Sequence, residues 1–209
     1  GAMSADTGTR LLVVRHGETD WNAQRRVQGH TDIALNDTGK RQASLLARAL
    51  ADSPIHHVYS SDLQRARHTA QALAGPHDAP HHVIAGLRER CFGSIEGQVF
   101  ADFEQRHPEA AFHWRTRTPH WEPPGDGESL LALRDRVERV VSEIAVRHPG
   151  QQVAIVSHGG VLDVLYRAAT RQELQAARTW MLPHCAINRL LWTPSGLALD
   201  GWGDVSHLD

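Results

Sequence analysis

Two short apolar runs in this chain each stop at a histidine followed by a glycine. The first, residues 11–14, leads into Arg15-His16-Gly17, and the second, residues 153–156, leads into Ser157-His158-Gly159-Gly160. Short valine-rich runs bounded by glycine are typical of strands that are buried on both faces of a parallel sheet. Ligands of such sheets bind beyond the carboxyl ends of the strands, so the pattern predicts an α/β fold with both histidines at a ligand-binding edge.

Length and composition favour one globular domain. The chain has 209 residues, 41% of them hydrophobic and 22% charged, which is enough to bury a core without metal or disulfide bonds. We expect this domain to span residues 10–209, after a tag remnant and flexible lead at residues 1–9. The formal net charge of −2 predicts no nucleic-acid partner, and the apolar runs are too short to span a membrane.

The cysteines and histidines show no metal-binding pattern. Cys91 and Cys185 are the two cysteines and lie far apart, which argues against a disulfide framework and favours a reducing, cytoplasmic location. Among the fifteen histidines, pairs such as His56-His57 and His81-His82 lack the spacing of metal ligands. We therefore expect these pairs to be solvated loop residues and expect no metal site.

The remaining pattern alternates strands with helices. Cap residues at 35–39 open a helix that ends before Pro54, and residues 61–64 form a capping box that places Arg65 in the first turn of the next helix. Three further predictions are an edge strand at 83–87, a longest helix that begins near Leu130 and ends near 148–150, and a closing hairpin of 188–192 with 197–202. Residues 93–127, with a helix broken at Pro108, form an insertion over the sheet.

Several charged residues occupy positions suited to chemistry on an anion. Arg15 flanks His16 at a strand end, Arg65 lies near the positive end of a helix dipole, and Glu89 follows another expected strand. Taken singly, each has a structural alternative. The histidine can simply satisfy a backbone carbonyl, Arg65 can be solvated, and Glu89 can be an exposed ion-pair partner.

Taken together, the motifs resemble the histidine phosphatase (phosphoglycerate mutase-like) superfamily over nearly the whole chain. The matching stretches, in order, are Arg15-His16-Gly17-Glu18-Thr19, Trp21-Asn22, Gln28-Gly29, Ser60-Ser61-Asp62-Leu63, Arg65-Ala66, Leu87-Arg88-Glu89-Arg90-Cys91-Phe92-Gly93, Glu96-Gly97, Gly127-Glu128-Ser129 and Val156-Ser157-His158-Gly159-Gly160.

The resemblance implies a three-layer α/β/α sandwich with a mostly parallel central sheet, one antiparallel edge strand and a helical and loop insertion over the active site. It also implies phosphoryl transfer through a phosphohistidine on His16, without a metal. Glu89 would be the general acid and base. The remaining expected roles are phosphoryl binding by Arg15, Arg65 and His158, and substrate binding by Asn22, Gln28, Gly159 and Arg88.

The acceptor of the phosphoryl group decides between two enzyme classes. Mutases of this superfamily have Glu-Arg-His-Tyr-Gly, a following lysine and paired arginines, and they need 2,3-bisphosphoglycerate as cofactor. Here His and Tyr are replaced by Cys91 and Phe92, the lysine is absent, and Arg115 and Arg117 are spaced. The sequence therefore favours a phosphatase with no cofactor, acting as a monomer or homodimer on a small phosphorylated metabolite. A mutase and a non-catalytic phosphate-binding protein remain the alternatives.

Overall fold

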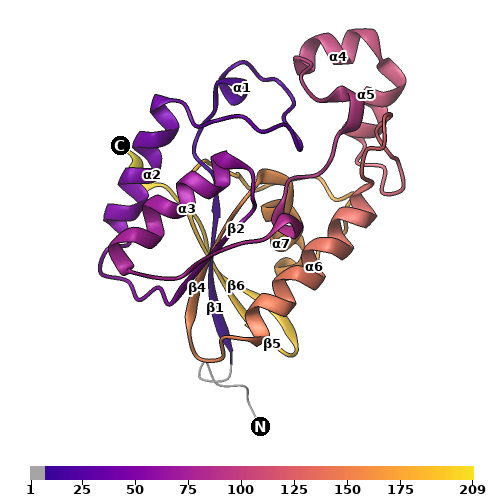
Figure 1. Cartoon of the computed structure of the whole chain (residues 1–209). Coiled ribbons are helices and arrows are strands. Elements are labelled where there is room, and N and C mark those ends of the chain that lie inside the picture. The colour runs from indigo at the N-terminus through magenta and orange to yellow at the C-terminus, as the bar shows by residue number, and fades with distance from the viewer. Residues whose placement is uncertain (1–7) are drawn as a thin grey trace.

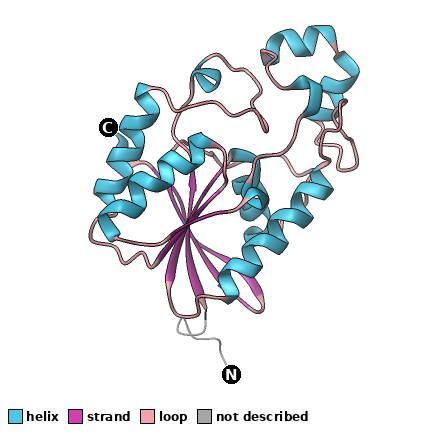
Figure 2. Ribbon diagram, viewed as in Figure 1, coloured by secondary structure: helices cyan, strands magenta, loops and turns pink. Residues whose placement is uncertain are grey.

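The computed structural model describes residues 8–209, which form a six-stranded sheet covered by helices on both faces (Figures 1 and 2). The strands are β1 (Thr9–Arg15), β2 (His57–Ser60), β3 (His81–Val83), β4 (Gln152–Ser157), β5 (Ile187–Thr193) and β6 (Gly196–Asp204). The helices are α1 (Asp20–Ala23), α2 (Asp37–Ala49), α3 (Gln64–His77), α4 (Phe100–Arg106), α5 (Pro108–Arg115), α6 (Leu130–Val146) and α7 (Gly159–Thr170).

The sheet separates two hydrophobic cores, which confirms the three-layer prediction. Leu11 and Val13 of β1 pack into the core beneath α6 and α7, whereas Leu12 and Val14 pack into the core beneath α2 and α3. Because side chains alternate along a strand, an uninterrupted apolar run is what a strand buried on both faces requires. At roughly 25 cal/mol per Å² of buried apolar surface, these two cores supply most of the favourable free energy of folding.

The strand order is β3-β2-β4-β1-β5-β6, and β1 to β4 are parallel. Strand β5 pairs antiparallel with β1 on one side and with β6 on the other. The antiparallel pairing therefore lies at this edge of the sheet, as predicted, with the reversed strand β5 next to the last strand, β6. The short turn between β5 and β6 forces the two strands to be neighbours, so β6 takes the edge.

Two local predictions are corrected by side chains that satisfy the backbone. The capping box at 61–64 does not form; the Gln64 N–H, at the start of α3, donates to Asp32 Oδ1 at 2.8 Å. The strand expected at 83–87 ends at Val83, and residues 85–87 form a 3₁₀ turn whose Gly86 carbonyl accepts from Arg136 at 2.8 Å. In both places a side chain distant in sequence, Asp32 or Arg136, makes the hydrogen bond to the backbone that a neighbouring residue was expected to make.

The lower end of the sheet also differs from expectation. Thr9, assigned above to the lead, is the buried first residue of β1 and its hydroxyl donates to the Ala145 carbonyl at 2.6 Å. Residues 1–7 of the proposed lead lie outside the described residues.

His57 and His82, expected in solvated loops, lie on β2 and β3, where their rings stack with centroids 5.2 Å apart.

The insertion at 93–127 lies above the carboxyl edge of the sheet (Figure 1). Its helices α4 and α5 meet at Pro108, as the sequence predicts, and bury a small core of their own around Phe103 and Ala111. Glu96 ties this segment to the loop after β1, because it accepts from Thr31 Oγ1 at 2.9 Å and from the Phe92 N–H at 2.9 Å. Within residues 8–209, no helix is long and apolar enough to cross a membrane.

Candidate active site

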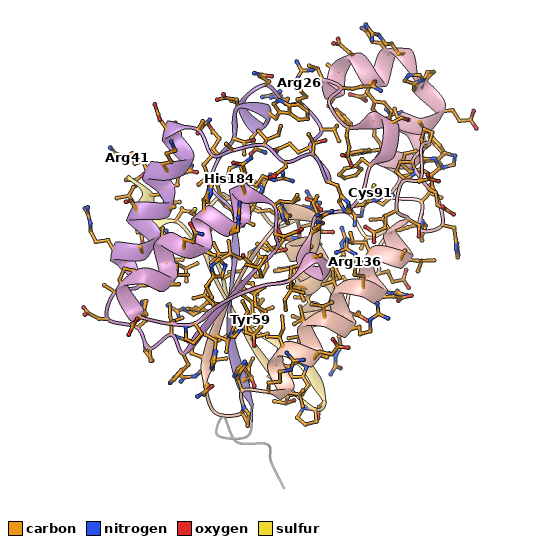
Figure 3. The ribbon with its side chains drawn as sticks, viewed as in Figure 1. Arg26, Arg41, Tyr59, Cys91, Arg136 and His184 are labelled. Carbon is orange, nitrogen blue, oxygen red and sulfur yellow. The ribbon has the colours of Figure 1, made fainter. Side chains whose placement is uncertain are left out.

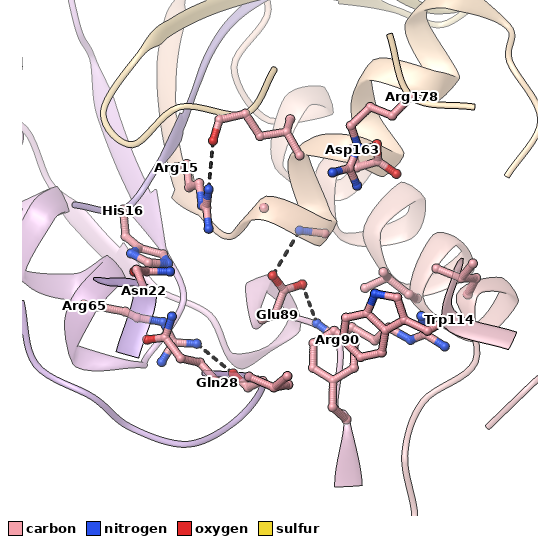
Figure 4. A pocket seen from close by; sticks show the side chains of 18 of the residues that line it. Arg15, His16, Asn22, Gln28, Arg65, Glu89, Arg90, Trp114, Asp163 and Arg178 are labelled. Atoms are coloured by element: carbon pink, nitrogen blue, oxygen red, sulfur yellow. Dashed lines mark hydrogen bonds and ion pairs between the residues drawn. The ribbon is translucent and has the colours of Figure 1, made fainter. Parts of the chain in front are cut away.

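Strand β1 delivers His16 to one side of a pocket at the carboxyl edge of the sheet (Figure 4). The His16 N–H donates to the Ser157 carbonyl at 3.0 Å, which extends the β1–β4 pairing by one residue. Its ring Nδ1 lies 2.6 Å from the Gly17 carbonyl. A carbonyl only accepts, so Nδ1 carries the proton and Nε2 keeps a free lone pair. Gly17 cannot carry a side chain, since a Cβ there would lie 2.5 Å from the Gly39 carbonyl oxygen.

Burial keeps the His16 imidazole neutral. Desolvation lowers its pKa well below the usual value, and the neighbouring His158, Arg65 and Arg15 lower it further. A third histidine, His184, donates from Nδ1 to the His16 carbonyl at 2.7 Å, and its ring lies 5.4 Å from that of His16. Burial beside Arg15 lowers the pKa of His184 to about 4. The sequence analysis missed His184, which Figure 3 places at the upper edge of the sheet.

His158 follows β4 and lies beside His16, as the repeated strand-His-Gly pattern predicts. Both rings are buried, and their centroids are 5.1 Å apart. His158 Nε2 lies 2.7 Å from Ser61 Oγ, whereas Nδ1 is buried and has no partner among the described residues. Burial, and after it the nearby Arg65 and Arg15, lowers the pKa of His158 well below its usual value. His158 is therefore neutral in the free protein, and it lies behind the residues that line the pocket.

Two arginines line the pocket; Arg65 is buried and Arg15 is half-buried. Arg15 Nη1 donates to the Leu182 carbonyl at 2.9 Å, and Arg65 donates to the carbonyls of Thr31 and Gly29 at 2.6 and 2.7 Å. The Nε groups of both arginines have no partner among the described residues. Burial lowers the pKa of Arg65 to about 10, which still leaves it charged at neutral pH. Two fixed cations beside a neutral imidazole form a site for an anion.

The loop after β1 brings two amide side chains to the pocket. Asn22 Oδ1 accepts from the Thr19 N–H at 3.0 Å, and Gln28 Oε1 accepts from Thr19 Oγ1 at 2.7 Å. Both oxygens are thereby occupied, so each amide nitrogen is left as the donor for a ligand. Gly159, at the start of α7, also lines the pocket, and a Cβ there would lie 3.4 Å from Arg15 Nε.

Arg88 is not among the pocket residues. Its guanidinium forms two hydrogen bonds with Asp62, at 2.7 and 2.6 Å, and both side chains are one-third exposed. The backbone at Arg88 is extended, so Arg88 and Glu89 point to opposite sides of the chain. Only Glu89 can face the pocket, and the substrate-binding role expected for Arg88 has no geometric basis.

Backbone donors fix the Glu89 carboxylate in the pocket. Oε1 accepts from the Arg90 N–H at 2.7 Å, and Oε2 accepts from the Gly160 N–H at 3.0 Å. A Cβ at Gly160 would lie 2.2 Å from Glu89 Oε1, so glycine is required there for the carboxylate to reach this position. Arg136 of α6 donates to the carbonyls of Arg88 and Glu89 and fixes this part of the backbone.

The pocket has a volume of about 640 Å³ and extends well beyond these residues. Its outer wall combines four arginines with aromatic and aliphatic side chains, which the sequence analysis did not identify as site residues. Solitary arginines in loops carry no local signal, and only the tertiary fold brings them to one cavity. These residues include Arg26, Arg90, Arg117, Arg178, Phe92, Trp114, Leu130, Leu133, Trp180 and Met181.

Comparison with known proteins shows the family. The model of the histidine phosphatase superfamily (branch 1) matches residues 11–205, and the chain belongs to this family. Phosphoglycerate mutase-like protein 4 of Arabidopsis thaliana is 38% identical over 202 residues, covering 95% of this chain and 86% of that protein. The metal-independent phosphoserine phosphatase of the same plant is 37% identical over 203 residues, covering 96% and 83%. The solved structure of Bacillus stearothermophilus YhfR superposes with a TM-score of 0.89 at 30% identity, covering 96% and 100%.

Family membership identifies the class of chemistry. The relatives include a phosphatase and a mutase-like protein, so this chain is an enzyme of the phosphatase or mutase type. In the part of the chain that the structure describes, no group of three or more histidine, cysteine, aspartate or glutamate side chains is arranged to bind a metal ion. The pocket instead presents arginines, His16 and the carboxylates of Glu89 and Asp163.

Proposed function

We propose that this protein is a metal-independent phosphomonoester hydrolase that acts through a phosphohistidine on His16. The observation that carries the proposal is the tautomer of His16, whose Nδ1–H is committed to the Gly17 carbonyl at 2.6 Å. The free Nε2 lone pair shares the pocket with two arginines and with a carboxylate in reach of a leaving group. These are the parts that nucleophilic phosphoryl transfer requires.

In the first half-reaction, His16 Nε2 attacks phosphorus, and the bond between phosphorus and the ester oxygen breaks. Arg15 and Arg65 bind the non-bridging oxygens, where their fixed charges need no reorganisation. The neutral His158 supplies a further donor from Nδ1 when its Nε2 accepts from Ser61. Glu89, in its protonated form, gives its proton to the departing oxygen, so the leaving group departs as an alcohol.

In the second half-reaction, water attacks the phosphohistidine. The Glu89 carboxylate accepts a proton from that water as the P–O bond forms, and the P–N bond to His16 breaks. Inorganic phosphate leaves, His16 returns to the neutral state, and Glu89 is again protonated for the next cycle. One carboxyl group serves both half-reactions, because the attacking water takes the place that the departing ester oxygen had in the first half-reaction.

The size of the pocket favours water as the acceptor. Its volume of about 640 Å³ corresponds to some twenty water molecules at ~30 Å³ each. A phosphoglycerate mutase must instead retain its 2,3-bisphosphoglycerate intermediate between two half-reactions. That alternative uses the same phosphohistidine and is supported by the name of the 38% identical relative, a phosphoglycerate mutase-like protein.

The insertion at 93–127 has the position of a lid. Phe92 borders it, and Trp114 and Arg117 reach from it into the pocket wall beyond Glu89. Groups beyond the general acid face the leaving group rather than the phosphoryl group. We therefore assign the choice among small phosphorylated metabolites to this segment, and the phosphoryl chemistry to the sheet edge.

Phosphorus NMR tests the proposal directly. The purified protein is incubated with 3-phosphoglycerate and a trace of 2,3-bisphosphoglycerate, and separately with phenyl phosphate. Release of inorganic phosphate without isomerisation is the expected result, whereas 2-phosphoglycerate with little inorganic phosphate would establish the mutase. Turnover of neither compound, nor of a panel of phosphomonoesters, would favour a phosphate-binding protein.

The His16→Ala variant tests the nucleophile. We expect loss of at least about 10³-fold in kcat with an unchanged melting temperature, since removal of a nucleophile leaves only binding and electrostatic effects. His68→Ala is the matched control because His68 is exposed on α3, away from the pocket. Retention of full activity by His16→Ala would exclude the phosphohistidine mechanism.

A further inference from the structure

The pocket has a second cluster of charges on the wall across from His16. Figure 4 shows Asp163 and Arg178 on that side, far from Arg65. Arg117 completes the cluster, and all three line the same cavity as the nucleophile. The proposed hydrolysis of the phosphate ester uses none of these residues, so their placement needs another explanation.

A single buried carboxylate organises this cluster. Asp163 Oδ2 accepts from Arg117 Nη2 and from Arg167 Nε, both at 2.8 Å, and Oδ1 accepts from Arg178 Nε at 3.0 Å. Three guanidinium groups thus share one carboxylate, which leaves an excess of two positive charges. Asp163 and Arg167 are only 2% exposed. The excess positive charge therefore lies toward the pocket, which Arg117 and Arg178 line.

Arg167 is buried and has a structural role. Its Nη1 donates to the carbonyls of Glu173 and Ala176, at 2.6 and 2.8 Å, and its guanidinium lies 4.8 Å from the centre of the Trp180 ring. It thereby anchors the loop after α7 that carries Arg178. The two arginines of the cluster that line the pocket are Arg117 and Arg178.

Both of these arginines keep donors for a ligand. Within residues 8–209, Arg117 uses Nε and Nη2 in hydrogen bonds to Leu174 and Asp163, which leaves Nη1. Arg178 uses Nε alone, so both of its Nη groups remain, and its side chain is 43% exposed. Asp163 fixes the direction of both guanidinium groups, so little side-chain entropy is lost when they bind an anion.

Part of the pocket wall is apolar. Trp114 stacks on Phe92 with ring centroids 4.6 Å apart, and Leu130 and Leu133 of α6 continue the wall. A leaving group that contacts this wall has hydrophobic surface. The lining thus has cationic groups near His16, a second pair of cations at Arg117 and Arg178, and an apolar stretch of wall beside Arg90.

We propose that Arg117 and Arg178 bind a second anionic group, a carboxylate or a phosphate, at the far end of the leaving group. The inference rests on the proposed phosphatase function and names its substrate class as a phosphomonoester of an apolar-bodied acid. The excess of two charges around Asp163 is then neutralised by the substrate. Arg117 joins this subsite from the insertion, so an anionic substrate also links the insertion to α7.

The test uses matched substrates that differ only in the remote group. The probes are 4-(carboxymethyl)phenyl phosphate, its carboxamide and 4-(phosphonomethyl)phenyl phosphate, with phenyl phosphate as the reference. We expect kcat/KM to be at least about tenfold higher for an anionic probe than for the carboxamide, mainly through KM, because a charge-assisted hydrogen bond has about that effect. Comparison of the two anionic probes distinguishes a carboxylate site from a phosphate site.

Variants assign the preference to this subsite. Arg178→Gln should reduce the ratio of kcat/KM for the anionic probe to kcat/KM for the neutral probe toward one. Arg178→Lys should keep part of this preference, because the positive charge remains. Arg115→Gln is the control, since Arg115 lies on the same insertion but pairs with Glu104 at the surface. Equal kcat/KM for charged and neutral probes in the unmodified enzyme would refute the second-anion site. Failure to hydrolyse phenyl phosphate as well would instead refute the phosphatase function on which it rests.

Discussion

The imidazole rings of His16 and His158 lie 5.1 Å apart, centroid to centroid, and both are buried beside two arginines. Desolvation is the largest cause that lowers both pKa values well below the ordinary value of 6.5, and the neighbouring cations add to it. A neutral His16 is a nucleophile. A neutral His158 adds no further positive charge beside Arg15 and Arg65 in the free protein.

The first prediction is that neither ring titrates near pH 6.5 in the free protein. The lowered pKa means that protonation occurs only on further acidification, so the ring ¹⁵N shifts of both histidines should stay constant from pH 8 to 6. Inorganic phosphate adds negative charge beside His158 and should raise its pKa. Long-range ¹H–¹⁵N NMR, with and without phosphate, measures both effects. A midpoint at or above 6.5 for His16 in the free protein would contradict the argument.

Strand burial and the strand-His-Gly pattern were sufficient to predict the inner half of the site. Both faces of β1 and β4 are covered, and this is why the apolar runs before His16 and His158 are uninterrupted. Arg65, at the second position of α3, also lies where its place in the helix predicts. Local sequence determines these positions because strand and helix ends determine where the side chains go.

The outer half of the site depends on contacts that sequence patterns do not carry. Arg117 and Arg178 are 61 residues apart, and only their shared carboxylate, Asp163, brings them together. His184 reaches His16 from the segment that precedes β5. Arg88 was misjudged because neighbouring residues of an extended segment alternate in direction, and the motif alone does not say which of the two faces the pocket.

A second prediction concerns the general acid. Removal of the carboxyl group in Glu89→Ala should lower kcat by about 10²–10⁴-fold for an alkyl phosphate, whose leaving oxygen needs a proton. The loss in the phosphorylation step should be much smaller for 4-nitrophenyl phosphate, because nitrophenolate leaves without protonation. Single-turnover kinetics with both substrates give the comparison. An equal loss of phosphorylation rate for both leaving groups would assign Glu89 a role other than proton donor.

Third, the position of that carboxylate depends on the absence of a side chain at Gly160. A Cβ there would lie 2.2 Å from Glu89 Oε1, so Gly160→Ala must displace the carboxylate. A displacement of about 1 Å can cost roughly 10²-fold in rate, and we expect a loss of this order in kcat with little change in stability. Gly75→Ala on α3 is the control, because nothing lies within 4 Å of its Cβ position. Full activity of Gly160→Ala would show that the position of Glu89 is not critical.

A fourth prediction concerns metal. In the proposed mechanism Arg15 and Arg65 neutralise the phosphoryl oxygens, a task that a divalent cation performs in many phosphatases. Dialysis against EDTA should therefore leave kcat/KM for phenyl phosphate within about twofold of the untreated enzyme. Added Mg²⁺ or Zn²⁺ should not increase it. A large loss on EDTA treatment that is restored by one metal would indicate a metallophosphatase.

The histidines at the opposite end of the sheet give the last prediction. The ring of His57 lies tilted against that of His148, with centroids 4.1 Å apart. The hydroxyl of Tyr59, which Figure 3 shows low in the sheet, lies 2.7 Å from His148 Nε2. Burial, followed by the neighbouring histidines, lowers the pKa of both His57 and His148 in the folded protein. The unfolded chain, with the ordinary value of about 6.5, therefore takes up protons first as the pH falls.

Proton uptake by the unfolded state lowers the free energy of unfolding. Stability should be greatest above pH 6.5 and should fall as the pH drops through 6.5 toward the lowered pKa values of the folded state. Urea denaturation at pH 7.5 and 5.5 measures this loss, to which the buried active-site histidines also contribute. His57→Gln removes one titrating group and also removes a neighbour that lowers the pKa of His148. The free energy of unfolding of this variant should therefore fall less between the two pH values than that of the unmodified protein. The exposed His68→Gln serves as control, and an equal loss in His57→Gln and the unmodified protein would show that the cluster does not couple folding to pH.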